Sequence, residues 1–330
     1  MSTTPMRAAM TPVTRQMRAY FAPVNRVNET PTIFDPGVSG GFPLNAPPYP
    51  WVDLGWIANF SRWYDTPTDV VRGGAKSLPA GQYRGALEAR VEFDFRQWGK
   101  LQMALAGGSE HMNVLAPLAG CSSPAPSGGA PAPAIAVLAG STASELVLGA
   151  GADSAFPAGS LIAVDVDYQQ EIGYVGSGIG GAYVSDPAAV GHDPNYVRRV
   201  TFNVGRVAET TATSVVLEQA LLGGTPAAGA SVQKVMAFVD REGGVFFQEW
   251  SALFVAQEDS GGRVCFFYPR LSASKTAGKA VREEFAEFAK PLSVISLRAS
   301  FLALPYVDGN DGQSVVCYRS YFPAAMAAVY

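Results

Sequence analysis

One segment of the chain, QYRGALEARVEFDF at residues 82–95, alternates apolar and polar side chains. Because successive side chains of a strand point to opposite faces, this period of two predicts a half-buried β-strand. The following segment, RQWGKLQMALAGGS, predicts a short amphipathic helix at Gln97–Ala106, which the glycine pair Gly107–Gly108 ends. We expect the apolar side of the strand to face this helix. That side consists of Tyr83, Leu87, Ala89, Val91, Phe93 and Phe95.

The turn-forming residues favour a β-rich fold for the rest of the chain. Glycine and proline occur 35 and 24 times in 330 residues, and charged residues make up only 16%. Helical bundles and coiled coils contain few glycines and prolines and many charged residues. The composition therefore predicts an all-β protein with many turns. The net charge of −4 argues against a basic face that binds nucleic acid.

Cysteines and histidines give no sign of a metal site or a catalytic pair. Cys121, Cys265 and Cys317 are odd in number and far apart, so neither a disulfide framework nor a zinc site is predicted. His111 and His192 lie outside the motifs in which a histidine is a catalytic base or a metal ligand. We expect reduced, buried thiols, loop histidines, and neither a cofactor nor a metal ion.

Two pairs of carboxylates leave a carbohydrate-active or carbohydrate-binding protein as an alternative. Asp165 and Asp167 stand two residues apart in a predicted strand, and so do Glu92 and Asp94. Residues i and i+2 of a strand share a face, so each pair could project together, as the carboxylates of a glycosidase do. A solvated strand face is the simpler interpretation of both pairs.

Two loop motifs match ligand-binding sequences only in part. The sequence DGNDG at 308–312 starts like a calcium-binding loop but lacks the glutamate that ends an EF-hand loop. The sequence GSGIGG at 176–181 is similar to a dinucleotide-binding loop, yet no helical pattern follows it. We interpret the first as a β-turn and the second as a surface loop.

An internal echo predicts an inserted domain. Residues 142–164 and 211–235 share a β-branched strand, a glycine loop, a Pro-Ala-Gly-like phrase and a second strand. Further predicted strands, Leu161–Tyr168 and Val197–Val207, suggest a small closed barrel. A Pro/Gly/Ala/Ser-rich stretch precedes it and is typical of a linker. The predicted organisation is an N-terminal arm (1–64), a main β domain (65–122 and 239–330), a linker (123–137) and an inserted barrel (138–238).

Residues 25–60 carry many turn signals and several aromatic residues. Proline argues against a central strand there, and the aromatic content is too high for a polar linker. We expect an ordered arm whose aromatic side chains lack partners within a single β domain. These anchors are Phe34, Phe42, Tyr49, Trp51 and Trp56.

The segment VVRGGAKSLPAGQYRGALEARVEFDFRQWGKLQMALAGGS resembles the strand and helix at the centre of bacteriophage tail tube proteins, the major tail protein family. Two later segments, FFQEWSALFVAQEDSGGRVCFFYPRLSASK and KPLSVISLRASFLALPYVDGNDGQSVVCYRSYFP, resemble the closing strands of that family. The resemblance covers about residues 65–115 and 240–325. It implies a tail-tube-type β-sandwich or barrel with one short packed helix, to which the inserted small β-barrel is added.

The resemblance also implies a function and partners. Tail tube subunits form six-fold rings that stack into a hollow tube, through which double-stranded DNA passes without specific binding. The implied partners are other copies of the chain and the tape measure, tail terminator and baseplate proteins. The arm would lie across an adjacent subunit. The polar side of the 82–95 segment would line an acidic lumen with Arg84, Glu88, Arg90, Glu92 and Asp94.

The location that follows is the virion tail, assembled in the cytoplasm of a host bacterium. We expect no membrane insertion, because the longest apolar stretches, such as Ile135–Ala139 and Ala324–Val329, are too short to span a bilayer. The alternative within virion structural proteins is a capsid decoration, baseplate or tail terminator component, which would share the β-rich, arm-bearing character.

Overall fold

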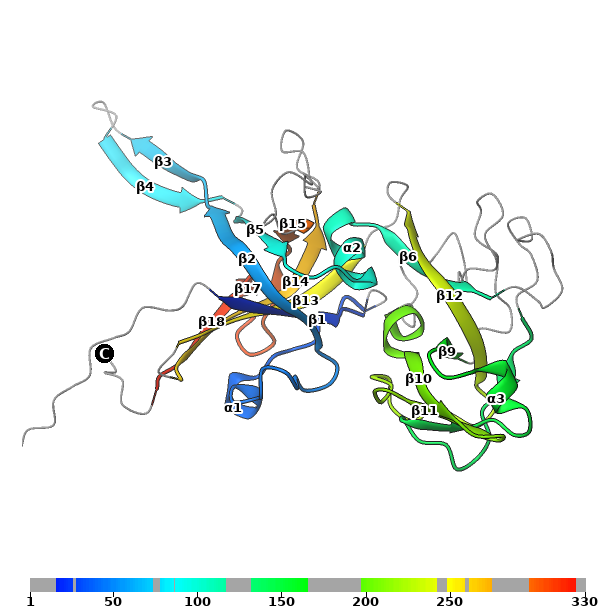
Figure 1. Ribbon diagram of the computed structural model, residues 1–330. Helices are drawn as coiled ribbons and strands as arrows, with labels where there is room; N and C mark the ends of the chain where they lie inside the picture. Colours follow the sequence, from blue (N-terminus) through cyan, green and yellow to red (C-terminus); the bar gives the residue numbers. More distant parts are fainter. Residues whose placement is uncertain are drawn as a thin grey trace, which may run out of the picture. The chain divides into compact units, whose positions relative to one another are not determined.

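The computed structural model describes residues 16–25, 28–73, 78–85, 87–116, 132–165, 197–241, 248–258, 261–274 and 297–324. Strands dominate the described residues and the helices are short, so the predicted all-β class is confirmed. The chain forms two compact units (Figure 1). The first comprises Met1–Val24, Thr30–Gly108 and Phe247–Tyr330, and the second Asn25–Glu29 and Ser109–Phe246.

The first unit is a closed antiparallel barrel. Its strands follow the order β13-β1-β2-β5-β15-β14, and β13 also pairs with β14, which closes the ring. A further strand, β18, pairs with β14 outside the ring. The strands are β1 (Met17–Pro23), β2 (Val52–Asp65), β5 (Glu88–Phe95), β13 (Glu249–Gln257), β14 (Arg263–Ala273), β15 (Leu297–Ala303) and β18 (Tyr318–Phe322).

Aromatic rings fill the interior of this barrel. Phe21, Phe93, Phe254 and Phe301 come from four different strands, and each is at most 1% exposed. The Phe93 ring stacks on Phe301 with 5.6 Å between centroids and meets Phe254 edge-on at 5.2 Å. Side chains fill the interior of a small barrel, and aromatic residues bury the most area for each position used.

A segment of the same unit covers one outer side of the barrel. Tyr20, Leu253 and Phe267 point outward from β1, β13 and β14 and belong to one buried cluster with Phe34 and Trp51. Every residue of β13 except the last is therefore buried. The covering segment contains the short helix α1 (Pro36–Ser39), at whose start the Asp35 carboxylate accepts a hydrogen bond from the backbone N–H of Gly37.

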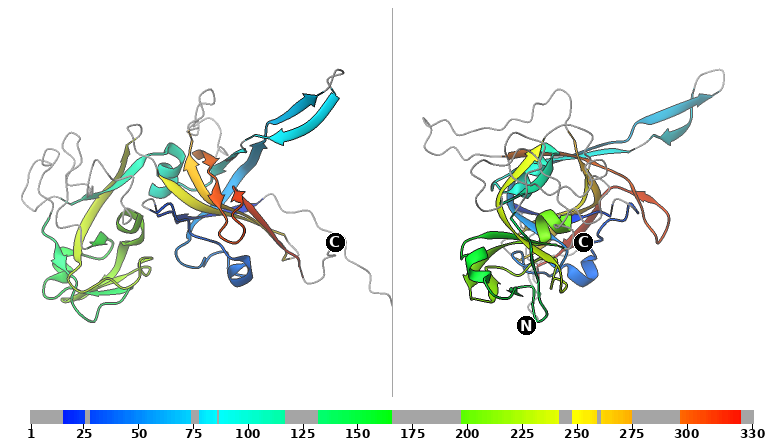
Figure 2. Two further views of the ribbon diagram at one scale, coloured as in Figure 1. Left: turned by 180° about the vertical axis from the view of Figure 1, so that it is seen from behind. Right: turned by 90° about the vertical axis from the view of Figure 1, so that its right-hand side faces the viewer.

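The predicted strand at 82–95 is two strands in two different sheets. Only β5 belongs to the barrel, whereas β4 (Leu78–Arg84) pairs with β3 (Thr68–Gly73) in a separate hairpin. This hairpin continues beyond β2 and projects away from the barrel (Figures 1 and 2). Leu87, between the two strands, is 40% exposed, so its predicted inward orientation is wrong.

The predicted short helix is present as α2 (Lys100–Gly107), and it ends at Gly108, whose φ of 59° is left-handed. Leu101 and Leu105 are buried, and the helix packs mainly against β15. The helix therefore packs on a strand far away in the sequence, and not mainly on the strand that precedes it.

After β15, two short strands, β16 (Tyr306–Val307) and β17 (Ser314–Val315), form a small hairpin.

The second unit is a curved antiparallel sheet with the order β6-β12-β9-β10-β11-β8, with β7 beside β12. A backbone hydrogen bond of 2.8 Å, which Leu138 N–H donates to the Val147 carbonyl, links the end of β7 to β8. The strands are β6 (Glu110–Leu115), β7 (Ile135–Ala136), β8 (Glu145–Val147), β9 (Leu161–Asp165), β10 (Val204–Thr210), β11 (Ser214–Leu217) and β12 (Ser231–Arg241), with a short helix α3 (Ala152–Ala155).

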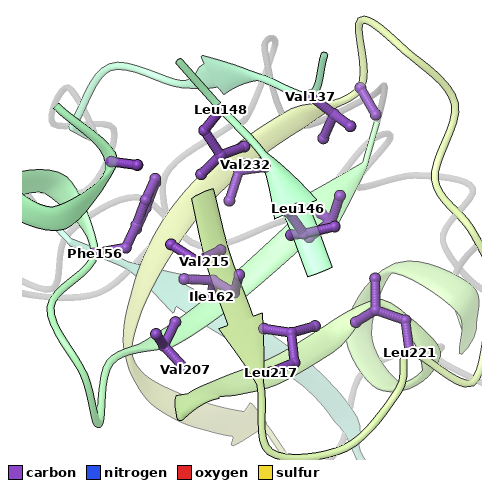
Figure 3. Packing of buried hydrophobic residues seen from close by; sticks show 13 residues of the cluster. Val137, Leu146, Leu148, Phe156, Ile162, Val207, Val215, Leu217, Leu221 and Val232 are labelled. Atoms are coloured by element: carbon purple, nitrogen blue, oxygen red, sulfur yellow. The ribbon is translucent and has the colours of Figure 1, made fainter. Parts of the chain in front are cut away.

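The internal echo of the sequence corresponds to paired strands of this sheet. The first strands of the two echoes, β8 and β11, pair with each other, and so do their second strands, β9 and β12. Each Pro-Ala-Gly-like phrase forms a turn with a glycine at positive φ, 85° at Gly159 and 88° at Gly229. The core between them is almost wholly aliphatic, with Leu146, Ile162 and Val232 at its centre (Figure 3).

Three predicted boundaries differ from the structure. The predicted arm, 1–64, contains β1 and β2, which are barrel strands paired on both sides. The second unit begins at Ser109 and not at residue 138, because β6 pairs with β12. The predicted strand Val197–Val207 begins instead with a π-helical turn, η3 (Arg198–Phe202).

Candidate assembly surface

The outer side of β5 carries the residues predicted to face the lumen. Glu88 is exposed, and Arg90 and Glu92 are half-buried. The guanidinium of Arg298, on the neighbouring strand β15, donates to the Glu92 carboxylate at 2.7 Å. This hydrogen bond raises the pKa of Arg298. Asp65 lies directly opposite Glu88 and is exposed.

Two of the predicted lumen residues do not belong to this exposed face. Arg84 lies on β4, opposite Thr68, in the separate hairpin. Asp94 is 8% exposed, and its carboxylate accepts a hydrogen bond of 2.6 Å from the Asn59 side chain. The alternation of the sequence could not reveal this, because Asn59 is contributed by a different strand. We call the charged residues that reach the surface on this outer side the polar face: Asp65, Glu88, Arg90, Glu92 and Arg298.

The polar face keeps a small acidic excess, although its members differ from the predicted set. It has three carboxylates and two guanidinium groups among the described residues. Arg84 and Asp94 leave the set, while Asp65 and Arg298 join it. Arg298 and Glu92 pair across strands, whereas Asp65 and Glu88 lie opposite each other with the same charge. The described face is therefore a mosaic of charges.

The expectation that the arm aromatics lack partners in their own domain is wrong for most of them. Phe34, Phe42 and Trp51 are at most 9% exposed. Phe34 and Trp51 both contact the ring of Phe267 on β14, at centroid distances of 6.2 and 6.1 Å. They cover the apolar outer side of the barrel, which the sequence does not reveal because distant segments build it.

The remaining two arm aromatics differ from the buried three. Trp56 lies in β2, half-buried, and the Arg18 guanidinium lies 5.4 Å from the centre of its ring. Arg18 also forms an ion pair with Asp53. Tyr49 is 68% exposed. Of the five predicted anchors, therefore, only Tyr49 presents most of its side chain to an outside partner.

The hairpin β3–β4 forms an exposed apolar surface that the sequence interpretation missed. Every described side chain of β3 is exposed, and among the described residues β3 and β4 pair only with each other. The signal was present in the Val-Val pair of TDVVRG between two turn sequences. We call the large exposed apolar residues here the hairpin patch. They are 40–70% exposed: Trp63, Tyr64, Val70, Val71, Tyr83 and Leu87.

The candidate carboxylate pairs do not form exposed pairs. Asp165 is 1% exposed, and its carboxylate accepts a hydrogen bond of 2.6 Å from Arg198. Asp167 lies outside the described residues. Glu92 binds Arg298, and Asp94 is buried, as described above. The geometry of the described Glu92–Asp94 pair gives no support to a glycosidase.

The DGNDG sequence forms the turn between β16 and β17. The Asp308 carboxylate accepts hydrogen bonds from the Asn310 backbone N–H at 2.9 Å and from the Tyr318 hydroxyl at 2.6 Å. The Asp311 carboxylate accepts one from the Gln313 N–H at 2.9 Å. These are internal turn contacts, and within the described part of the chain no three His, Cys, Asp or Glu side chains gather as metal ligands.

The predictions for the cysteines, the histidines and the glycine loop differ in how they compare with the structure. Cys265 and Cys317 are free thiols; burial raises the pKa of Cys265 to about 11. His111 is 1% exposed in β6 and is not a loop histidine. Cys121, His192 and the glycine loop at 176–181 lie outside the described residues.

No family model and no curated protein matches the chain. Among the described residues, no helix has the length and apolar character needed to cross a bilayer.

Proposed function

We propose that the chain is a structural subunit of a bacteriophage tail tube, in which rings of subunits stack around a DNA-conducting channel. The observation that carries this proposal is the projecting β3–β4 hairpin with its exposed hairpin patch. A lone two-stranded hairpin is marginally stable in water, and open strand edges with exposed apolar residues are ready to pair with another chain. A subunit that remained alone would gain nothing from this element.

The rest of the first unit supports a role as a building block. Its closed barrel has an aromatic interior that makes a rigid body without a bound ligand. The polar face offers mixed charges with a small acidic excess, which suits a wall along which DNA slides without stopping. The specific assembly, a tail tube, is proposed from the resemblance of residues 65–115 and 240–325 to tail tube proteins.

Electron microscopy of the purified full chain tests the proposal directly. We expect rings or open-ended tubes in negative stain, and fast-sedimenting species in the ultracentrifuge. A double variant of the hairpin patch, Val70→Asp with Val71→Asp, should stay monomeric and folded. The matched control is the double variant Leu138→Asp with Leu222→Asp, which adds the same two charges at leucines of the second unit that are 45% and 46% exposed and should still assemble.

The outcome separates the alternatives. Closed particles of one fixed size would favour a decoration, baseplate or terminator component over a tube. A full chain that remains monomeric at every concentration would overturn the proposal. So would a hairpin double variant that forms tubes as readily as the unaltered chain.

A further inference from the structure

The first unit contains a groove of about 630 Å³ beside the strand β18. Its apolar lining includes Phe34, Phe267 and Tyr306, and its polar lining includes Asp35, Asp308 and Arg319. The stacked rings of Tyr318 and Phe267, 5.8 Å apart, form part of this lining. Sites of this volume hold a ligand that is larger than a single side chain.

The groove lies over the outer face of β18, and Tyr318, Arg319 and Ser320 all line it. Tyr318 and Ser320 pair with Phe267 and Cys265 of the buried outer cluster, so both lie on the covered side of the sheet. The edge of β18 away from β14 borders this side. That edge is open in the described part of the chain, because β18 ends the strand order and pairs only with β14.

The groove contains charged groups of both signs. No ion pair joins Asp35, Asp308 or Arg319 to any described residue. Hydrogen bonds from Tyr318 and Asn310 lower the pKa of Asp308, so its carboxylate is ionised at neutral pH. The groove therefore presents both signs of charge around an aromatic lining and an unpaired backbone edge, which are the features that receive an added β-strand.

We infer that this groove binds the β3–β4 hairpin of a second copy of the chain, which adds a strand to the open edge of β18. The inference rests on the proposed function, since it requires self-assembly, and it names the surface that the hairpin contacts. The hairpin supplies open strand edges and the apolar side chains of the hairpin patch. It also carries both signs of charge on exposed residues, Asp69 and Arg72.

The hairpin of the same copy is not placed to fill the groove. In Figures 1 and 2 the hairpin leads away from the barrel, while α1, which follows the groove residue Asp35, lies on another side of it. A contact between two different surfaces of identical chains is heterologous. Such contacts repeat from copy to copy and build rings when the rotation closes, or filaments when it does not.

Disulfide trapping between two single variants tests the contact. Val70→Cys places a thiol on the hairpin and Ser320→Cys places one on the groove edge; a parallel register that brings these two together also places Asp69 opposite Arg319. We expect an intermolecular disulfide when the two proteins are mixed under mild oxidation, and at least tenfold less in either protein alone. The matched control mixes Val70→Cys with Leu222→Cys, an exposed site outside the groove, and should give only the background of the native thiols.

A charge exchange gives a second readout that needs no new thiol. Arg319→Glu in the groove and Asp69→Lys on the hairpin should each weaken association by about tenfold, because each leaves like charges facing each other. The double variant should recover most of the affinity. The control is Arg96→Glu, which makes the same charge change at an exposed arginine that lines no part of the groove and should leave association unchanged.

The results of these experiments test the groove contact and the proposed tail tube function separately. Tubes that form without the Val70–Ser320 disulfide, and without charge rescue, would overturn the groove contact and leave the proposed function intact. Trapped dimers or short chains from a protein that forms no tube would retain the groove contact and overturn the tail tube. If the mixed proteins form neither, both proposals are wrong.

Discussion

The two outer sides of the barrel are built from strands of the same sheet, yet they differ in chemistry. On β1, β13 and β14 the outward side chains are apolar and lie beneath Phe34, Phe42 and Trp51. On β2, β5 and β15 they form the polar face, where charged groups pair across strands. A strand position is apolar outside the barrel where another part of the chain covers it, and polar where none of the described residues does.

The comparison explains why β13 and β5 look so different in the sequence. β13 is buried on both sides and is a nearly continuous apolar run, EWSALFVA, which gives no period. β5 is covered only from the inside and alternates strictly. The burial of one strand therefore depends on a segment two hundred residues away, whereas the burial of the other depends on the barrel alone.

The largest expected effect is on the covered side. Trp51→Ala should destabilise the first unit by about 3–5 kcal/mol, because it removes a buried ring from the aromatic cover. Urea unfolding followed by fluorescence and circular dichroism measures the change. Tyr49→Ala, at a 68% exposed aromatic of the same segment, is the control and should change stability by less than about 0.5 kcal/mol. Equal effects of the two variants would mean that the cover is not a packed layer.

The next effect concerns the ion pair between Arg270 and Glu249, which lies between the strands β14 and β13. The guanidinium donates to the carboxylate at 2.8 Å, and the two side chains are 15% and 4% exposed. Arg270→Ala should cost about 3 kcal/mol, because it leaves a buried carboxylate without this partner. The double variant Arg270→Met with Glu249→Leu should recover most of that loss. A single variant as stable as the double would show that the carboxylate reaches water.

Cys265 reports directly on the cover. Burial raises the pKa of its thiol from 9.0 to about 11, so at pH 8 its reactive thiolate should be about a hundredfold rarer than that of an unperturbed thiol. Alkylation, followed by peptide mass spectrometry, should be slow in the native chain and faster in Trp51→Ala. The folded thiol holds its proton more tightly than the unfolded one, so this residue's contribution to stability declines as the pH rises from 9 to 11. Rapid labelling of the native protein would show that the cover opens readily.

The smallest effect is expected on the polar face. Arg298→Gln removes the partner of Glu92 at a site where the arginine side chain is 46% exposed. Exposed ion pairs contribute between 0 and about 1 kcal/mol, and salt screens them. We expect a loss of about 0.5 kcal/mol at low salt that disappears in 1 M NaCl. A loss above about 2 kcal/mol would show that this side, too, is covered in solution.

Some of these features can be predicted from local sequence patterns, whereas others depend on contacts between distant parts of the chain. The alternation at 88–95, the helix stop at Gly108 and the paired echoes in the second unit all depend on residues close together in sequence. The division between β4 and β5 depends instead on distant residues, because β4 pairs with β3 whereas β5 pairs with β15. No local pattern shows that the proline-rich segment packs on the barrel, since the apolar outer side that it covers includes the distant strands β13 and β14.

The way in which β14 shares one of its edges has a consequence for how the barrel opens. Arg263–Phe267 pair with β18, and only Leu271–Ala273 pair with β15 to complete the ring. In the described part of the chain, ring closure at this edge therefore depends on a short seam of three residue pairs and two flanking backbone hydrogen bonds, from Leu304 N to Arg270 O and from Ser274 N to Ser300 O. Local opening begins where the fewest bonds must break, so amide hydrogens along Leu271–Ala273 should exchange with solvent before those of the remaining barrel wall. We therefore expect the barrel to open first by separation of β14 from β15.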